Sequence, residues 1–265
     1  MPRVALLDCD GPGNAGGDSQ GDISITNEEM AANLQQWLTE PGDDDDGDGA
    51  WEWTTFRVKT KGELPRADDF DAFIMPGSRS NVTDGEEWME PLGALLRDVH
   101  SQGKPLVGIC FGNQMLAAAL GGRVASRGSF NCAIDAIVTT PAAADYSIEG
   151  SAENPLRLFK GHSQEVVELP PGASLLGSSD STAVELWAIG NTVLGCQGHP
   201  DFGAELSTRL VPEMEAIGLL DADAAATLAA GMQPDHPTPV ANDLFKLRIR
   251  EVLSGECRAV QQSKL

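Results

Sequence analysis

The chain has 265 residues, 41% hydrophobic and 22% charged, an ordinary composition for a globular protein that is large enough to bury a core. Its formal net charge of −22 would repel phosphate backbones and anionic lipid surfaces, so we expect no nucleic-acid partner and no membrane partner. No apolar run approaches the roughly 18 residues of a membrane span, and no secretory signal is recognised, so a cytoplasmic protein is expected.

The first half of the chain alternates between two kinds of pattern. Apolar stretches rich in β-branched residues predict strands at 3–8, 51–58, 72–75 and 105–109. Apolar residues at helical spacing predict helices at 28–38 and 88–100. Strands that alternate with helices indicate an α/β fold with a mostly parallel sheet covered by helices on both faces.

Two loops in this half match ligand-binding patterns only formally. GPGNAG at 11–16 satisfies GxGxxG, but the polar, turn-rich residues that follow predict no helix there to hold a pyrophosphate. The aspartates of 43–48 match the start of a calcium loop, but its twelfth position is Thr55 where a glutamate is needed. We therefore expect a solvated acidic loop and no dinucleotide site, and the acidity alone does not show whether the protein works in high salt.

A cysteine lies between two glycines where a predicted strand ends, in KPLVGICFGNQ at 104–114. Residues 113–120 are good helix formers, so Cys110 is expected at a strand-to-helix turn. Flanking glycines allow the strained turn in which a nucleophile projects above a sheet. The helix N-terminus favours a thiolate, and the Phe111 amide can face an oxyanion on an attacked carbonyl. The alternative is a buried structural cysteine, which would not need the glycines.

The other cysteines show no pairing pattern. The five cysteines of the chain are widely spaced and contain no CxxC pair. This arrangement argues against a disulfide framework and against a structural zinc site. Free thiols are therefore expected.

The second half of the chain changes character. Short strands separated by turns are predicted at 133–139, 165–169, 183–189 and 192–197. They indicate an antiparallel extension at one edge of the parallel sheet. From residue 203 onward the pattern is mainly helical. Without a repeat or a clear boundary, residues 1–265 are expected to form one domain with a helical C-terminal extension at 203–265.

A cysteine nucleophile usually needs a base, and the chain offers His100, His162, His199 and His236. Only His199 comes with a candidate carboxylate, because Asp201 follows two residues later and extended residues at that spacing lie on one side. Such a carboxylate can fix the imidazole tautomer and stabilise the imidazolium. The alternative is a surface loop in which this histidine and aspartate occur together by chance. The nucleophile turn predicted at Cys110 makes that alternative less favoured.

Together, Cys110, His199 and Asp201 resemble the class I glutamine amidotransferase family, whose motifs are GxCxGxQ and, later in the domain, HPE. The resemblance covers residues 1 to about 205 and implies a flavodoxin-like sheet with an antiparallel edge. GICFGNQ and CQGHPDF are most similar to stand-alone γ-glutamyl peptidases and to the amidotransferase domain of GMP synthases. This chain has Asp201 where the family usually has glutamate, and Asn113 where it usually has histidine.

The resemblance implies roles for further residues. The segment MPGS matches the turn whose amide contributes to the oxyanion hole, here Gly77 together with Phe111. Gln114 matches the glutamine that helps to bind the substrate. Arg79 and Asn81 follow the turn and are candidates for binding the substrate's α-carboxylate. No metal or cofactor is implied.

The implied reaction is the hydrolysis of a γ-glutamyl amide through a thioester on Cys110, with His199 as acid and base. His162, in the family-like segment GHSQEV, is expected to be structural or adjacent to the substrate. No SGGxDS-like phosphate loop occurs, so a complete GMP synthase is not expected. The favoured hypothesis is a peptidase acting on glutathione-like peptides or conjugates. The others are a glutaminase subunit supplying ammonia to a separate synthase partner, and a non-catalytic binding or regulatory module.

Overall fold

A computed structural model of the chain describes residues 1–10, 27–39, 51–150, 155–233 and 242–256. The GPGNAG segment, the aspartate-rich loop, His236 and Cys257 lie outside these ranges. Within them, no helix is both long enough and apolar enough to cross a membrane.

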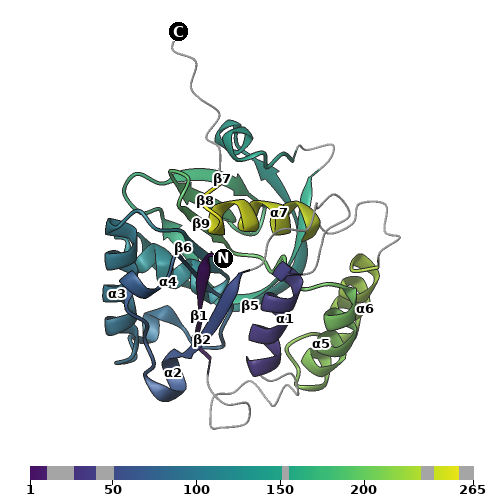
Figure 1. The fold of residues 1–265 in the computed structure, drawn as a ribbon. Coiled ribbons are helices and arrows are strands. Elements are labelled where there is room, and N and C mark those ends of the chain that lie inside the picture. Colours follow the sequence, from purple (N-terminus) through teal and green to yellow (C-terminus); the bar gives the residue numbers. More distant parts are fainter. Residues whose placement is uncertain (11–26, 40–50, 151–154, 234–241, 257–265) are drawn as a thin grey trace.

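One nine-stranded sheet lies at the centre of the molecule (Figure 1), in the order β2-β1-β3-β4-β9-β8-β7-β5-β6. The strands are β1 (Arg3–Asp8), β2 (Glu52–Arg57), β3 (Ala72–Met75), β4 (Leu106–Ile109), β5 (Arg123–Thr139), β6 (Leu156–Glu168), β7 (Ser174–Ser178), β8 (Leu186–Ile189) and β9 (Val193–Cys196). Strands β2, β1, β3, β4 and β9 pair in parallel, and the remaining four extend the sheet antiparallel. The carboxyl ends of the parallel strands meet at one edge, where open α/β sheets bind ligands.

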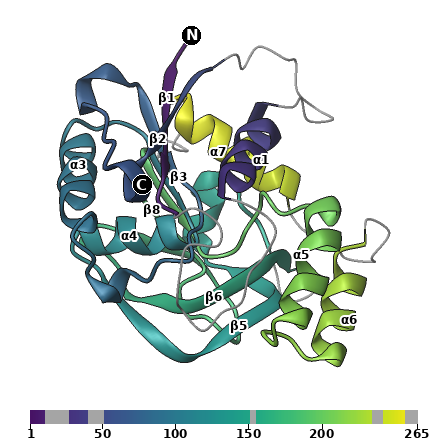
Figure 2. The same ribbon diagram turned by 90° about the horizontal axis from the view of Figure 1, so that it is seen from below.

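Helices cover both faces of this sheet (Figure 2). They are α1 (Asn27–Thr39), α2 (Val58–Lys61), α3 (Met89–Ser101), α4 (Phe111–Ala119), α5 (Ala204–Ala216), α6 (Ala222–Gly231) and α7 (Asn242–Leu253), with short 3₁₀ turns at Ala67–Asp69, Val82–Asp84 and Pro141–Tyr146. Helices α1 and α7 share one apolar cluster with the sheet, and α3 and α4 share another. The predicted fold class, an α/β fold with an antiparallel edge, is confirmed.

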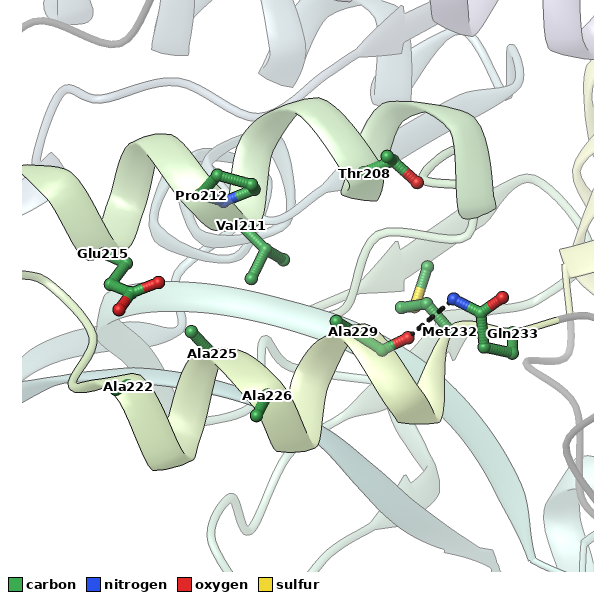
Figure 3. Close-up of a pocket in the computed structure, with 10 residues that line it drawn as sticks. All are labelled: Thr208, Val211, Pro212, Glu215, Ala222, Ala225, Ala226, Ala229, Met232 and Gln233. Atoms are coloured by element: carbon green, nitrogen blue, oxygen red, sulfur yellow. Dashed lines mark hydrogen bonds between the residues drawn. The ribbon is translucent and has the colours of Figure 1, made fainter.

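The C-terminal helices pack in two different places. Phe245 and Ile249 of α7 are buried in the cluster that contains Val107 of β4 and Leu194 of β9. Helices α5 and α6 instead pack beside β5 and β6, around Phe159. The groove between α5 and α6 is lined mainly by alanines and other apolar side chains, and it shares no residue with the predicted site (Figure 3). That residues 1–265 form one domain stays a prediction.

The strand predictions were accurate in the parallel half and incomplete in the antiparallel half. Strands β1 and β3 have the predicted bounds, and β2 and β4 differ by one residue at their ends. By contrast, β5 and β6 begin about ten residues earlier than predicted, and β7 was not predicted. The β5–β6 pairing contains a register shift between Ser126 and Asn131, and both strands carry many half-exposed polar residues. Cross-strand pairing, which local patterns do not report, forms this hairpin.

Candidate active site

Cys110 lies between β4 and α4, at the carboxyl edge of the sheet. Its backbone angles are φ 53° and ψ −106°, a conformation that residues with a side chain rarely adopt. The Cys110 N–H donates to the carbonyl of Cys196 (2.8 Å), and the Gln114 N–H donates to the carbonyl of Cys110 (3.1 Å). These bonds hold a strained turn that costs about 1–3 kcal/mol and is typical of functional sites.

The two glycines of the motif are required by close backbone contacts. A Cβ on Gly108 would lie 2.5 Å from the carbonyl oxygen of Gly112, and a Cβ on Gly112 would collide with the carbonyl of Met75. Because these neighbours are backbone atoms, they have little room to move. The strand, the turn and the helix therefore pack together only when both positions are glycine, which explains the GxCxG pattern.

His199 follows β9 and is buried beside Cys110. The backbone N–H of His199 donates to the carbonyl of Phe159 (2.8 Å), and the imidazole ring packs on the ring of Phe202 with centroids 4.1 Å apart. A Cβ built on Gly77 would lie 2.7 Å from Cε1 of His199 and 3.6 Å from Cβ of Cys110. The structure thus brings His199, Cys110 and the Gly77 turn together at one point.

Asp201 lies on the other side of the imidazole. Its Oδ1 is 3.5 Å from Nδ1 of His199, a distance of an ion pair and longer than an ordinary hydrogen bond. The backbone carbonyl of Asp201 accepts a bond from the side-chain amide of Asn33 on α1 (2.9 Å). Only 3% of Asp201 is exposed, so its charge acts on His199 with little screening by water.

The electrostatics of the site favour a charged imidazole. Burial by itself lowers the pKa of His199, but the neighbouring Cys110 and Asp201 raise that pKa to about 10. At neutral pH the imidazole of His199 therefore carries a positive charge beside the sulfur of Cys110, and it can supply a proton as an acid. Burial lowers the pKa of His162 to about 4, so that ring is neutral at pH 7, and its Nδ1 lies 2.8 Å from the Gln164 carbonyl.

We expect Asp201→Asn to move the alkaline limit of activity to lower pH. The Asp201 carboxylate, together with Cys110, raises the pKa of His199, so the loss of the carboxylate lets the imidazolium deprotonate at a lower pH. We also expect kcat/KM at neutral pH to fall roughly 10- to 100-fold, less than the ~10⁴-fold loss in a serine triad, because the neighbouring Cys110 still raises the pKa of His199. A pH profile of kcat/KM measures both effects. Asp201→Glu, which keeps the charge, is the control, and an unshifted alkaline limit in Asp201→Asn would contradict the role.

The two residues predicted for the oxyanion hole both lie next to Cys110. Phe111 is the first residue of α4, so its N–H has no carbonyl of that helix to bond. Gly77 approaches Cys110 from the end of β3, and the Gly112 N–H holds the preceding carbonyl of Pro76 (3.2 Å). Both residues lie next to Cys110, and the role of their amides in binding an oxyanion stays a prediction.

Gln114 is turned into the protein. Its Nε2 donates to the Gln164 carbonyl (2.7 Å) and to Oε1 of Gln197 (3.1 Å). Asn113 beside it donates to the same Gln197 oxygen (3.4 Å) and accepts from Nε1 of Trp187 (2.5 Å). Both hydrogens of the Gln114 amide are thus used to connect α4, β6 and the segment after β9. Its contact with a substrate stays a prediction.

Arg79 and Asn81 follow the Gly77 turn at the same edge of the sheet. The Nε of Arg79 is 3.6 Å from Oδ2 of Asp10. The amide of Asn81 donates to Asp84 (3.3 Å) and accepts from the hydroxyl of Ser163 on β6 (3.3 Å). Both are partly exposed, and their binding of an α-carboxylate stays a prediction.

In the described part of the chain, no group of three or more His, Cys, Asp or Glu side chains is arranged to hold a metal ion.

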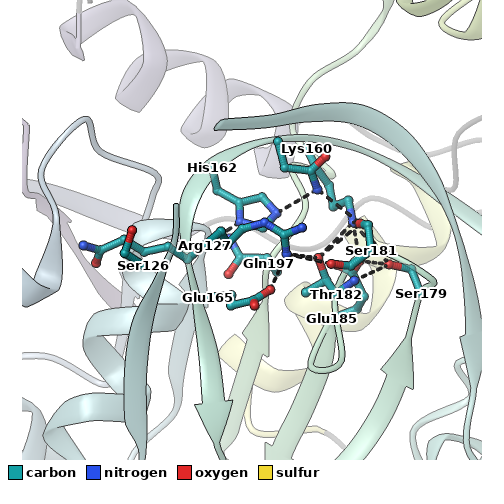
Figure 4. Close-up of polar contacts among 12 residues, drawn as sticks. Ser126, Arg127, Lys160, His162, Glu165, Ser179, Ser181, Thr182, Glu185 and Gln197 are labelled. Carbon is teal, nitrogen blue, oxygen red and sulfur yellow. Dashed lines mark hydrogen bonds and ion pairs between the residues drawn. The ribbon is translucent and has the colours of Figure 1, made fainter. Parts of the chain in front are cut away.

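A buried charged cluster beside the site was missed in the sequence (Figure 4). The ammonium of Lys160 is fully buried, 2.5 Å from Oε1 of Glu185 and 2.6 Å from Oδ2 of Asp135. Its further hydrogen-bond acceptors are hydroxyl groups, those of Ser179, Ser181 and Thr182. The only sequence signal was a lysine inside the apolar run LRLFKG.

Lys160 of this cluster lies on β6, the strand that borders the nucleophile. Phe159, next to Lys160, provides the carbonyl that holds His199. Gly161, on the other side of Lys160, places its carbonyl 3.8 Å from the sulfur of Cys110. The cluster thus fixes a segment of β6 that forms one wall of the site.

Comparison with known proteins finds a family model, related sequences and similar folds. The model of the Glutamine amidotransferase class-I family matches residues 50–217. Gamma-glutamyl peptidase 5 of Arabidopsis thaliana is 33% identical over 197 residues, 72% of this chain and 78% of that protein. One chain of the glutamine-hydrolyzing GMP synthase of Halobacterium salinarum is 30% identical over 146 residues, 54% of this chain and 73% of that protein. The crystal structure of a glutamine amidotransferase from Methylobacillus flagellatus has a TM-score of 0.64 at 20% identity, covering 100% of this chain and 97% of that one.

Proposed function

Since the chain belongs to the class I glutamine amidotransferase family, we propose that it hydrolyses γ-glutamyl amide bonds with a cysteine nucleophile. The observation that carries this proposal is the meeting of Cys110, on a strained turn, with the buried pair His199 and Asp201. The γ-glutamyl substrate class is supported by the relatives named γ-glutamyl peptidases.

In the proposed reaction, the thiolate of Cys110 attacks the γ-carbonyl carbon, and the resulting oxyanion accepts bonds from the amides of Gly77 and Phe111. The imidazolium of His199 gives its proton to the departing amine as the C–N bond breaks. The γ-glutamyl thioester is then attacked by a water whose proton returns to His199, releasing glutamate and the free thiolate. Asp201 stabilises the imidazolium in both steps.

A peptide or peptide conjugate such as glutathione is our favoured substrate. The γ-glutamyl peptidases 2 to 5 of Arabidopsis thaliana match 66–72% of this chain, whereas the GMP synthase chain of Halobacterium salinarum matches 54%. The second candidate is a glutaminase subunit that passes ammonia to a separate synthase, and the similarity to that GMP synthase chain favours it. A non-catalytic module has the least support, because Cys110 and His199 lie together.

The test is product release from glutathione and from glutamine by the isolated protein, with Cys-Gly, ammonia and glutamate quantified separately. Cys-Gly released from glutathione is the expected result. Ammonia from glutamine alone would instead support the synthase-coupled glutaminase. Absence of both products, at full thiol content, would contradict an autonomous hydrolase.

A further inference from the structure

Asp10 joins the end of β1 to the turn that carries Gly77. Its Oδ1 accepts bonds from the hydroxyl of Ser78 (3.2 Å) and from the backbone N–H of Arg79 (3.1 Å). Its Oδ2 lies 3.6 Å from Nε of Arg79, and only 12% of the Asp10 side chain is exposed. The carboxylate of Asp10 therefore binds the two residues that directly follow Gly77. Its Oδ1 binds the turn itself, and its Oδ2 lies beside the Arg79 side chain.

The same turn is also held from its other end. The Gly112 N–H, in the first turn of α4, donates to the carbonyl of Pro76 (3.2 Å). The one hydrogen of the Ser78 hydroxyl is shared between Asp10 and the carbonyl of Cys9 (3.0 Å), and the hydroxyl oxygen accepts from the N–H of Ser80 (3.0 Å). The Gly77 peptide is thus held on one side by the Gly112 bond to Pro76 and on the other by the bonds of Asp10 to Ser78 and Arg79. Gly77 has no side chain that could make further contacts.

The position of this peptide matters because Gly77 packs directly on the reacting groups. A Cβ at Gly77 would lie within 3.6 Å of both His199 and Cys110. A small movement of the turn therefore changes the distance between the Gly77 N–H and the reacting groups. An oxyanion-hole donor is effective only when it lies about 2.7–3.1 Å from the oxyanion.

We propose that Asp10 is a positioning residue that, through Ser78 and the Arg79 amide, holds the Gly77 N–H where it receives the oxyanion. This inference rests on the proposed function and deepens it. The Oδ1 contacts position the turn, whereas the Oδ2 contact orients the Arg79 side chain. The two tasks are separable, because asparagine keeps a carbonyl acceptor for Ser78 and the Arg79 amide but loses the negative charge.

The experiment compares Asp10→Ala, Asp10→Asn and the wild type. Steady-state kcat and KM are measured for glutamate release from glutathione and from glutamine. The alkylation rate of Cys110 by iodoacetamide is followed in parallel by peptide mass spectrometry, because alkylation by displacement at carbon forms no oxyanion. Asp71→Ala is the matched control: Asp71 accepts from the Arg3 N–H (2.7 Å) and pairs with its side chain at the opposite end of β1.

We expect Asp10→Ala to lose roughly 10- to 100-fold in kcat, part of the 10²–10³-fold loss for a deleted oxyanion donor, with an unchanged alkylation rate. Asp10→Asn should restore kcat to within about 3-fold of the wild type, and Asp71→Ala should leave kcat and KM unchanged.

Three results would overturn the inference. An unchanged kcat in Asp10→Ala, or an equal fall in turnover and alkylation, would overturn the positioning role while the wild-type activity still stands. A wild type that is alkylated at Cys110 but releases no glutamate would overturn the proposed function itself, and the inference with it.

Discussion

Cys110→Ala is expected to reduce glutamate release by about 10⁴-fold or more, because loss of a nucleophile removes the covalent route and leaves only binding and the oxyanion donors. Alanine can keep the backbone conformation and the hydrogen bond from residue 110 to the Cys196 carbonyl, so the thermal unfolding midpoint should change little. Turnover and circular dichroism melting, measured on the same preparation, separate the loss of chemistry from a loss of fold.

Cys132→Ala provides the thiol control. Cys132 lies on β5, where its sulfur contacts the sulfur of Met214 (4.0 Å), and burial raises its pKa to about 12. Its thiol is therefore protonated at neutral pH and makes no nucleophile, so we expect near wild-type turnover from this variant. Residual turnover of Cys110→Ala close to that of Cys132→Ala would contradict the assignment of the nucleophile.

The largest effect on stability is expected from Lys160→Met. This change leaves the carboxylates of Glu185 and Asp135 without their buried cation, and removing one partner of a buried ion pair costs about 3–5 kcal/mol. The free energy of unfolding, measured by urea denaturation, should fall by this amount. Turnover should fall as well, because Phe159 and Gly161 flank Lys160 and form the wall beside His199 and Cys110.

The control is the double variant Lys160→Met with Glu185→Gln, which removes the fully buried charge together with its partner. We expect it to regain a substantial part of the lost stability, because an amide costs less to bury than an unpaired carboxylate. If the single variant lost less than about 1 kcal/mol, as an exposed pair would, the cluster would contribute little to the fold.

The parallel half of the sheet and the pattern around Cys110 could be predicted from local stretches of sequence. Buried parallel strands are continuous apolar runs, and tight strand-to-helix turns need glycine, so both features are readable within a few residues. The candidate pair of His199 and Asp201 could also be found, because residues two apart in an extended segment share a side.

The support of the site, by contrast, depends on contacts that exist only in the folded chain. Asp10 lies 68 residues from Ser78 and Lys160 lies 25 residues from Glu185, and nothing in the local sequence relates them. The long β5–β6 hairpin likewise depends on cross-strand pairing, and the inward turn of Gln114 depends on partners from β6 and from the segment after β9. Hydrogen bonds and ion pairs between distant segments form only when the chain is folded, whereas turns and apolar periodicity are encoded residue by residue.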